Sequence, residues 1–467
     1  MSQDDRQCVR RLVSLIGEIA WGWVGRHQPE FFRRFEELCG NWQGPYPDLK
    51  DLFSSLQVEF LVYDALYLRD EVAPTRCLGD KFIEFVAASN YQIVEPAIDT
   101  DRMKLPSTAV HLLVKRQQRT ETRMDYHREL FQDLFIIYHP RVVDSDGSTL
   151  LHAICRLKND SYRITRLFFR INKIRGRTVD VDARDKRGDT ALHVAVAAGN
   201  KRTAEVLLEE GADPNLANEL RSTPLHVILA RNREEDDESG LLRTFLETAE
   251  DVGRRVDVNA RDDYGRMPLQ YALSYIMPNT ASLILTRNVD MARFSFPESF
   301  ATGDDDCKLR QVSGILRCVE TLERKGGYLL RQNDAQSILR FFAADEFFKK
   351  LRRLNGEKWF EDPIFMGEAE NVWLGECTLL DLIFMKPAAA ERKYSPDKYW
   401  MISELRLLNR LPEAFLEPSI LFLCKVMARG FFRRLMLLCW KNSIPDALRR
   451  PQPDLDGIRE DLLHICT

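Results

Sequence analysis

Four of the eight histidines in this chain occupy one repeated sequence slot, Thr-x-apolar-His. The slot is found at residues 108–111, 149–152, 190–193 and 223–226, and a fifth copy reads Met267-Pro268-Leu269-Gln270. Histidine is the commonest metal ligand and a frequent general base, so four of them could build a metal or catalytic site. Whether they do depends on the elements that position them.

The spacing of the slots indicates those elements. The slot histidines follow one another at intervals of 41, 41 and 33 residues, and Gln270 comes 44 residues after His226. A period near 33 with insertions is typical of a repeat array. Equivalent residues on neighbouring helices then lie about 8–10 Å apart, whereas zinc ligands lie about 2 Å from the ion. We therefore interpret His111, His152 and His193, like His226, as structural, and expect no metal, cofactor or catalytic residue.

The most regular copy predicts a turn, a helix, a short turn and a second helix. Gly188 supplies the positive φ of the first turn, and Thr190 is expected to cap the first helix. Pro224 and Pro268 take the first helical position in later copies, where a missing N–H costs nothing. The structural signature residues are His111, Gly147, Thr149, His152, Gly188, Thr190, His193, Thr223, His226 and Gly265.

Asp-x-x-Gly-x-Thr-x-Leu-His followed by Leu-Leu-x-x-Gly-Ala-Asp-x-Asn, at residues 185–215, resembles the ankyrin repeat. Weaker copies lie at residues 218–230, with Arg221 replacing the turn glycine, at 144–183, at 262–290 and from near Cys77 to Tyr138. The resemblance implies an all-α ankyrin-repeat solenoid of about five repeats, two of them degenerate. It also implies that the histidines hydrogen-bond locally and tie neighbouring repeats together. The overall layout is similar to that of ankyrin-repeat proteins from parasitoid wasps.

Helical regions are expected to flank the repeats. The expected organisation is an N-terminal helical region at 1–78, the ankyrin repeats at 79–300, an acidic linker at 301–312 and a C-terminal helical region at 313–467. The N-terminal region, with a helix over residues 52–68, would cover the apolar end of the array, and a dedicated partner-binding module is the alternative. Two insertions, at 170–181 and 232–240, lengthen the array.

Residues 411–440 carry a second resemblance. Leu411-Pro412-Glu413 precedes one apolar helical pattern, and Gly430 separates it from another that ends at Cys439-Trp440. Two short helices after Leu-Pro-Glu are similar to the F-box-like C-termini of pox-type ankyrin proteins. That similarity would imply docking to the core of a cullin-type ubiquitin ligase. A plain helical cap is our first interpretation, with the F-box-like role as the alternative.

Composition restricts the partner. The 467 residues carry a net charge of −4, so no global field attracts nucleic acid. Residues 401–450 contain nine Lys/Arg and four Asp/Glu, which leaves a nucleic-acid-associated role as a further alternative to a solvated helix face. No apolar run approaches the ~18 residues of a membrane span. Ten cysteines without a C-x-x-C pair indicate a cytoplasmic or nuclear protein that is not secreted.

We expect a non-catalytic monomer that binds another protein. Stacked ankyrin repeats present turn tips and inner helices as one long surface. Tip residues beside the turn glycines vary in chemistry, which is typical of a recognition surface, although solvated turns would vary as well. The candidate partner-binding residues are Asp146, Lys186, Arg187, Glu219, Leu220, Asp263 and Tyr264. Leu220 and Tyr264 are the best candidates, because solubility does not explain an apolar or aromatic tip.

Overall fold

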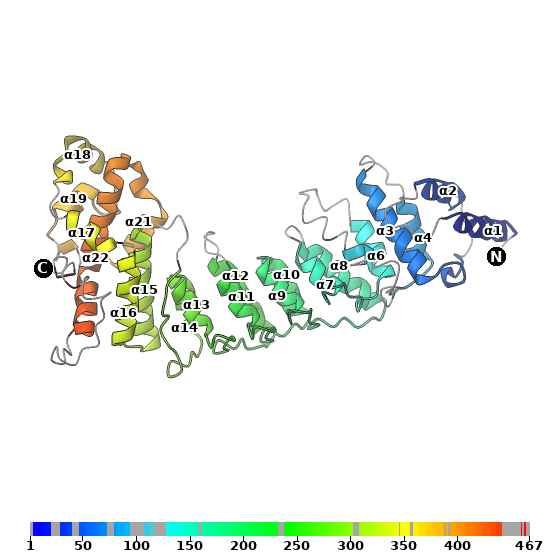
Figure 1. Cartoon of the computed structure of the whole chain (residues 1–467), viewed down its shortest axis with the longest axis horizontal. Coiled ribbons are helices and arrows are strands. Elements are labelled where there is room, and N and C mark those ends of the chain that lie inside the picture. The colour runs from blue at the N-terminus through cyan, green and yellow to red at the C-terminus, as the bar shows by residue number, and fades with distance from the viewer. Residues whose placement is uncertain are drawn as a thin grey trace. The chain divides into compact units, whose positions relative to one another are not determined.

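The computed structural model divides the chain into two compact units. Figure 1 labels the helices of both. One unit comprises residues 1–228 and 243–256, and the other comprises 229–242 and 257–467. The residues that the structure describes are 3–19, 29–39, 46–71, 79–93, 108–111, 114, 128–157, 161–231, 238–301, 308–344, 346–354, 358–386, 389–390, 393–440, 459 and 462–463. These residues form helices and isolated β-bridges but no strand, which confirms the all-α class.

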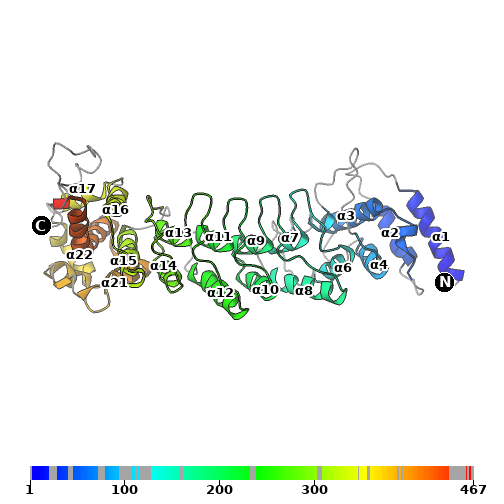
Figure 2. The same ribbon diagram turned by 90° about the horizontal axis from the view of Figure 1, so that it is seen from below.

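The repeat helices lie in two rows (Figure 2). Short helices α7 and α9 lie in one row, and α6, α8 and α10 lie in the other, with each helix packed on its neighbours. In the described residues up to 251, the helices are α1 (Gln3–Gly17), α2 (Pro29–Cys39), η1 (Leu49–Asp51), α3 (Ser55–Glu71), α4 (Asp80–Ala88), α6 (Arg128–Ile137), α7 (Leu150–Cys155), α8 (Ser161–Ile174), α9 (Ala191–Ala197), α10 (Lys201–Glu209), α11 (Pro224–Ala230) and α12 (Glu238–Asp251). The boundary between the two units passes through α11 and α12.

Small and apolar residues explain the close packing of these rows. Ala191, Leu192 and Ala195 of α9 are fully buried, and alanine lets neighbouring helices approach closely. A charged side chain caps the C-terminal end of α6. The guanidinium of Arg177 donates to the carbonyl oxygens at the end of α6, including that of Ile136 at 2.7 Å, and so satisfies groups that have no partner within the helix.

The helix expected over residues 52–68 begins later, at Ser55. Ser54 and Gln57 fix this start: the Ser54 N–H donates to the Gln57 side chain (2.8 Å), and the Gln57 N–H donates to the Ser54 hydroxyl (3.3 Å). This reciprocal pair satisfies two donors at the helix start. Leu52 and Phe53 therefore precede the helix.

The second unit continues from the last repeat helices into the C-terminal region. Helix α14 packs on α15, and α15 packs on α21 and α22. The helices are α13 (Pro268–Ser274), α14 (Pro278–Leu285), α15 (Lys308–Gly326), α16 (Gln332–Ala344), α17 (Phe347–Leu354), η3 (Trp359–Glu361), α18 (Pro363–Ala369), α19 (Leu379–Phe384), α21 (Pro396–Glu404), η4 (Leu407–Arg410) and α22 (Glu413–Trp440). The rings of Phe342, Phe348 and Phe432 contact one another between α16, α17 and α22.

The expectation of two short helices in 411–440 is wrong. Helix α22 runs without a break from Glu413 to Trp440, through Gly430. A glycine inside a helix costs only about 1 kcal/mol, and this cost is offset because Leu423 on one side and Leu435 on the other are fully buried. Buried packing on both sides therefore keeps one helix.

The expected linker at 301–312 is also too long. Helix α15 begins at Lys308, because Leu309 and Val312 are fully buried and extend the apolar face. Within the expected insertion at 170–181, residues 170–174 belong to α8. Residues 232–237 of the acidic insertion lie outside the described residues. No helix in the described part of the chain is long and apolar enough to cross a membrane.

Candidate functional site

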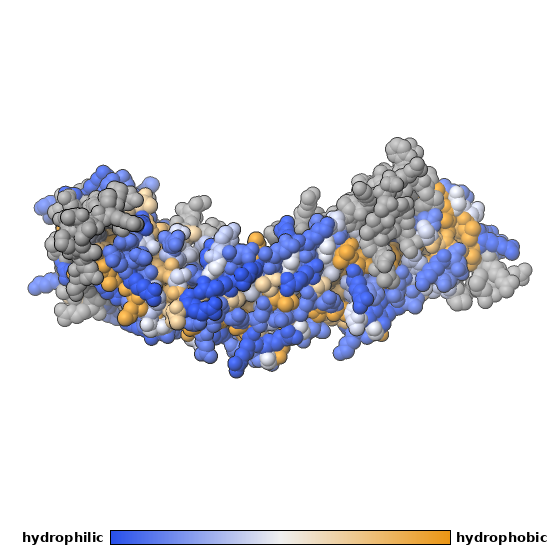
Figure 3. Space-filling view, turned by 60° about the horizontal axis from the view of Figure 1, so that its bottom comes forward, coloured by the Kyte–Doolittle hydropathy of each residue, from blue (hydrophilic) through white to orange (hydrophobic). Residues whose placement is uncertain are grey.

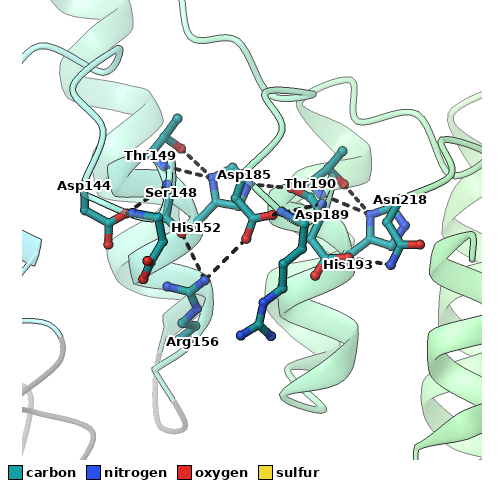
Figure 4. Close-up of polar contacts among 12 residues, drawn as sticks. Asp144, Ser148, Thr149, His152, Arg156, Asp185, Asp189, Thr190, His193 and Asn218 are labelled. Carbon is teal, nitrogen blue, oxygen red and sulfur yellow. Dashed lines mark hydrogen bonds and ion pairs between the residues drawn. The ribbon is translucent and has the colours of Figure 1, made fainter. Parts of the chain in front are cut away.

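The Thr-x-apolar-His slot lies at the start of each short repeat helix (Figure 4). At α9, the Nδ1 atom of His193 accepts hydrogen bonds from the Thr190 backbone N–H (3.1 Å) and hydroxyl (2.9 Å). An N–H can only donate, so Nδ1 is the acceptor and Nε2 carries the proton. Nε2 donates to the Ser222 carbonyl oxygen of the next repeat (3.0 Å). Thr190 is the N-cap residue of α9, as expected, and the imidazole of His193, three residues further on, accepts from its backbone N–H.

His152 makes the same connection at α7. Its Nδ1 accepts from the Thr149 N–H (3.1 Å) and hydroxyl (2.8 Å), and its Nε2 donates to the Asp189 carbonyl oxygen (3.0 Å). Burial lowers the pKa of His152 and of His193, so both rings are neutral near pH 7. Both nitrogens are engaged, which leaves no lone pair for a metal. These histidines tie neighbouring repeats together, as expected.

Two other slots show how far the pattern tolerates change. His226 accepts from the Thr223 N–H (3.2 Å) and hydroxyl (2.9 Å). In the fifth slot, the Gln270 side-chain oxygen accepts from the Met267 N–H (2.7 Å), and its amide donates to the Ser295 hydroxyl (2.9 Å). Like a neutral imidazole, the glutamine side chain presents an acceptor atom and a donor group. Gln270 therefore keeps the role of hydrogen-bonding the start of its helix.

The first slot depends on a residue that sequence reasoning missed. His111 Nδ1 lies 2.5 Å from the Thr108 hydroxyl. Buried Glu59 of α3 accepts from the Ala109 N–H (2.9 Å) and from the Tyr138 hydroxyl (3.0 Å). Burial raises the pKa of Glu59 to about 7. The signal that could have found Glu59 is an acidic residue between Val58 and Phe60, in an apolar run that also contains Asp64.

A side-chain oxygen shapes each turn that precedes these helices. Asp185 accepts from the N–H groups of Arg187 (2.9 Å) and Asp189 (3.0 Å), and Asn218 accepts from those of Leu220 (3.0 Å) and Ser222 (3.0 Å). Gly188 has φ +73° and Arg221, at the equivalent position, has φ +53°. Arg221 therefore occupies a conformation that costs a non-glycine residue about 1–2 kcal/mol.

Backbone hydrogen bonds link successive turn tips. The Lys186 N–H donates to the Asp146 carbonyl oxygen (2.9 Å), and the Glu219 N–H donates to the Arg187 carbonyl oxygen (3.0 Å). The first unit therefore holds the tips of three turns side by side (Figure 2). All seven candidate residues are exposed, Leu220 by 58%. Asp263 and Tyr264 belong to the second unit, so the structure does not place them relative to the other five.

Tyr264 is held in place although it is 76% exposed. The Arg266 guanidinium lies 4.5 Å from the Tyr264 ring centre and 4.6 Å from that of Tyr271. Asp262 fixes Arg266 through an ion pair (3.2 Å) and accepts from the Tyr271 hydroxyl (2.6 Å). Cation–π contact over two rings restricts the tip aromatic before any partner binds. Sequence reasoning named Tyr264 but missed Arg266.

A further turn and helix of related design lie at residues 371–384, within the expected C-terminal helical region. Gly375 has φ +94°, and Trp373 forms an antiparallel bridge with Thr378. Thr378 caps α19: its N–H and hydroxyl donate to Asp381 (3.0 and 2.8 Å), and its hydroxyl accepts from the Asp381 N–H (3.1 Å). Thr-Leu-Leu-Asp is the signal that could have shown it, with aspartate in the histidine position.

Comparison with known proteins agrees with this geometry. A family described as ankyrin repeats (3 copies) matches residues 122–218. The chain carries ankyrin repeats. Its relatives include alpha-latrotoxin-Lg1a of Latrodectus geometricus, 31% identical over 134 residues, which are 28% of this chain and 9% of the toxin. Neurogenic locus notch homolog protein 1 of Xenopus laevis is 30% identical over 132 residues, 23% of this chain and 5% of that protein.

The ankyrin match and the helix rows together show an all-α ankyrin-repeat solenoid. The chain spans less than a tenth of the length of these relatives. The likeness therefore concerns the repeats. Ankyrin repeats are a protein–protein interaction domain, which directs the functional question to the exposed turn tips.

Proposed function

We propose that this chain is a non-catalytic scaffold whose ankyrin turn tips and inner helices bind a partner protein. The observation that supports the proposal is the set of exposed tip side chains of differing chemistry on hydrogen-bonded turns. Positive, negative and apolar tips on a rigid frame can select one partner, because ordering costs little on binding. Leu220 and Tyr264 are the proposed anchors, since buried apolar and aromatic anchors carry most interface energy.

The test is partner capture by proximity labelling with the full chain. One variant combines Leu220→Ser with Tyr264→Ser, and a matched control combines Leu329→Ser with Leu437→Ser, which are 79% and 51% exposed outside the repeats. Proteins recovered with the wild type and the control but lost with the tip variant support the proposal. An unchanged set with the tip variant would show that these tips are not the binding surface.

The ubiquitin-ligase alternative loses its sequence support, because α22 is one helix rather than two. The nucleic-acid alternative is likewise weaker for the described residues of 401–450. Arg434 pairs with Glu323 (3.0 Å), and Phe432 is fully buried. We therefore keep the protein-binding scaffold as the single proposed function.

A further inference from the structure

Helix α8 carries a row of positive charge that is separate from the turn tips. Residues 161–177 contain six Lys or Arg and no Asp or Glu. The four basic residues within α8 are all exposed, and they are Arg163, Arg166, Arg170 and Lys173. At 3.6 residues per turn these positions fall within about 80° of one another. They therefore form one basic row along the helix.

Apolar and aromatic side chains continue the same face. Ile174, at the C-terminal end, is 73% exposed. At the other end the Tyr162 hydroxyl accepts from Arg163 (3.1 Å) and Arg202 (3.3 Å), and both guanidinium groups lie over its ring. These contacts lower the pKa of Tyr162, chiefly through the hydrogen bond from Arg163. The local field is therefore positive.

Nearby acidic groups do not neutralise the C-terminal part of the row. Arg166 pairs with Glu209 of α10 (3.1 Å), with both side chains exposed. Within the described part of the chain, no carboxylate lies in ion-pair contact with Arg170 or Lys173. Exposed pairs such as Arg166–Glu209 contribute less than about 1 kcal/mol and exchange readily with another carboxylate.

We propose that the basic row of α8 binds an extended acidic segment of a partner protein. The row spans about 15 Å from Arg163 to Lys173 at 1.5 Å per residue. Alternate side chains of an extended chain lie about 6.6 Å apart, close to the spacing of about 4.5–6 Å between successive cations on the helix. Carboxylates at every second position would therefore each meet a basic residue, and an apolar residue could contact Ile174.

The surroundings favour a peptide over nucleic acid. The helices that pack on either side, α6 and α10, each expose acidic residues, including Glu129 of α6 and Glu209 of α10. A basic row with exposed carboxylates on both sides suits a single extended chain better than the wide charge of a duplex. The Tyr162 ring already contacts two guanidinium groups, which compete with a base for its face. Hydrophilic residues cover most of the repeat surface in Figure 3, which suits a charge-based contact.

Fluorescence anisotropy with the full chain tests the proposal. The probe is a labelled peptide of four alternating Glu–Ser pairs, and the variant is Arg170→Glu with Lys173→Glu. The matched control, Arg352→Glu with Arg353→Glu, makes the same charge change on exposed positions of α17. We expect the α8 variant to bind the peptide about tenfold more weakly than the wild type. The control should stay within about twofold, and added salt should weaken wild-type binding.

Three results would overturn the proposal: no peptide binding by the wild type at low salt, equal losses in the two variants, or tighter binding of a duplex DNA of equal charge. Circular dichroism confirms that both variants fold. The milder pair Arg170→Gln with Lys173→Gln should give an intermediate affinity. Peptide binding should be unchanged in the double variant Leu220→Ser with Tyr264→Ser. The test of the α8 row is therefore independent of the test of the turn tips.

Discussion

Replacing Gly188 by alanine should destabilise the repeats far more than the same change at Gly253. Both glycines lie in the first unit with nearly equal φ, +73° and +76°. The left-handed strain of about 1–2 kcal/mol is therefore common to both. A Cβ at Gly188 would lie 2.7 Å from the Glu219 backbone nitrogen, whereas a Cβ at Gly253 meets nothing within 4 Å.

The expected difference in stability follows from the close contact between a Cβ at Gly188 and the Glu219 backbone nitrogen. Gly188→Ala must move the Glu219 backbone and loses the Glu219 N–H to Arg187 hydrogen bond (3.0 Å), at about 1 kcal/mol. Crowding against backbone adds about 1–3 kcal/mol. We expect the free energy of unfolding to fall by at least about 2 kcal/mol more for Gly188→Ala than for Gly253→Ala.

Urea denaturation followed by circular dichroism measures the two free energies of unfolding, and amide exchange at Glu219 reports the lost bond. Faster Glu219 exchange in Gly188→Ala alone would locate the damage at the tip. Equal free energies for the two variants would refute the close approach of successive turns.

Two further predictions concern the same repeats. Arg221→Gly should raise the free energy of unfolding by about 0.5–1 kcal/mol, because relief of left-handed strain exceeds the added unfolded-state entropy; a lower urea midpoint would contradict this. Burial lowers the pKa of His193 in the folded protein, whereas in the unfolded chain it has the ordinary histidine value of about 6.5. Below that pH the unfolded chain therefore binds more protons than the folded protein. The melting temperature should therefore fall from pH 7.5 to 5.5, and less so in His193→Gln, which copies Gln270. The raised pKa of Glu59 has the opposite effect, because it makes the folded state more stable at acidic pH. The difference in melting temperature between the wild type and His193→Gln therefore isolates the contribution of His193.

The repeats were predictable because their determinants are local. Thr190 and His193 are three residues apart, and one helical turn brings them together. The turn at Gly188 needs a positive φ that the residue type itself favours. The C-terminal region was less predictable. Gly430 marks a break in sequence but not in structure, because buried packing on both sides outweighs helix propensity.

The sequence alone determined the period, the turn chemistry and the seven tip positions, since each depends on residue type at short spacing. Tertiary structure decided which long-range partners these residues meet. It gave His193 the Ser222 carbonyl oxygen, gave Glu59 the Tyr138 hydroxyl, and placed the cations of α8 beside exposed carboxylates of α6 and α10. Such pairings depend on how repeats stack, and burial and distance between repeats are set by packing across the array rather than by any local pattern.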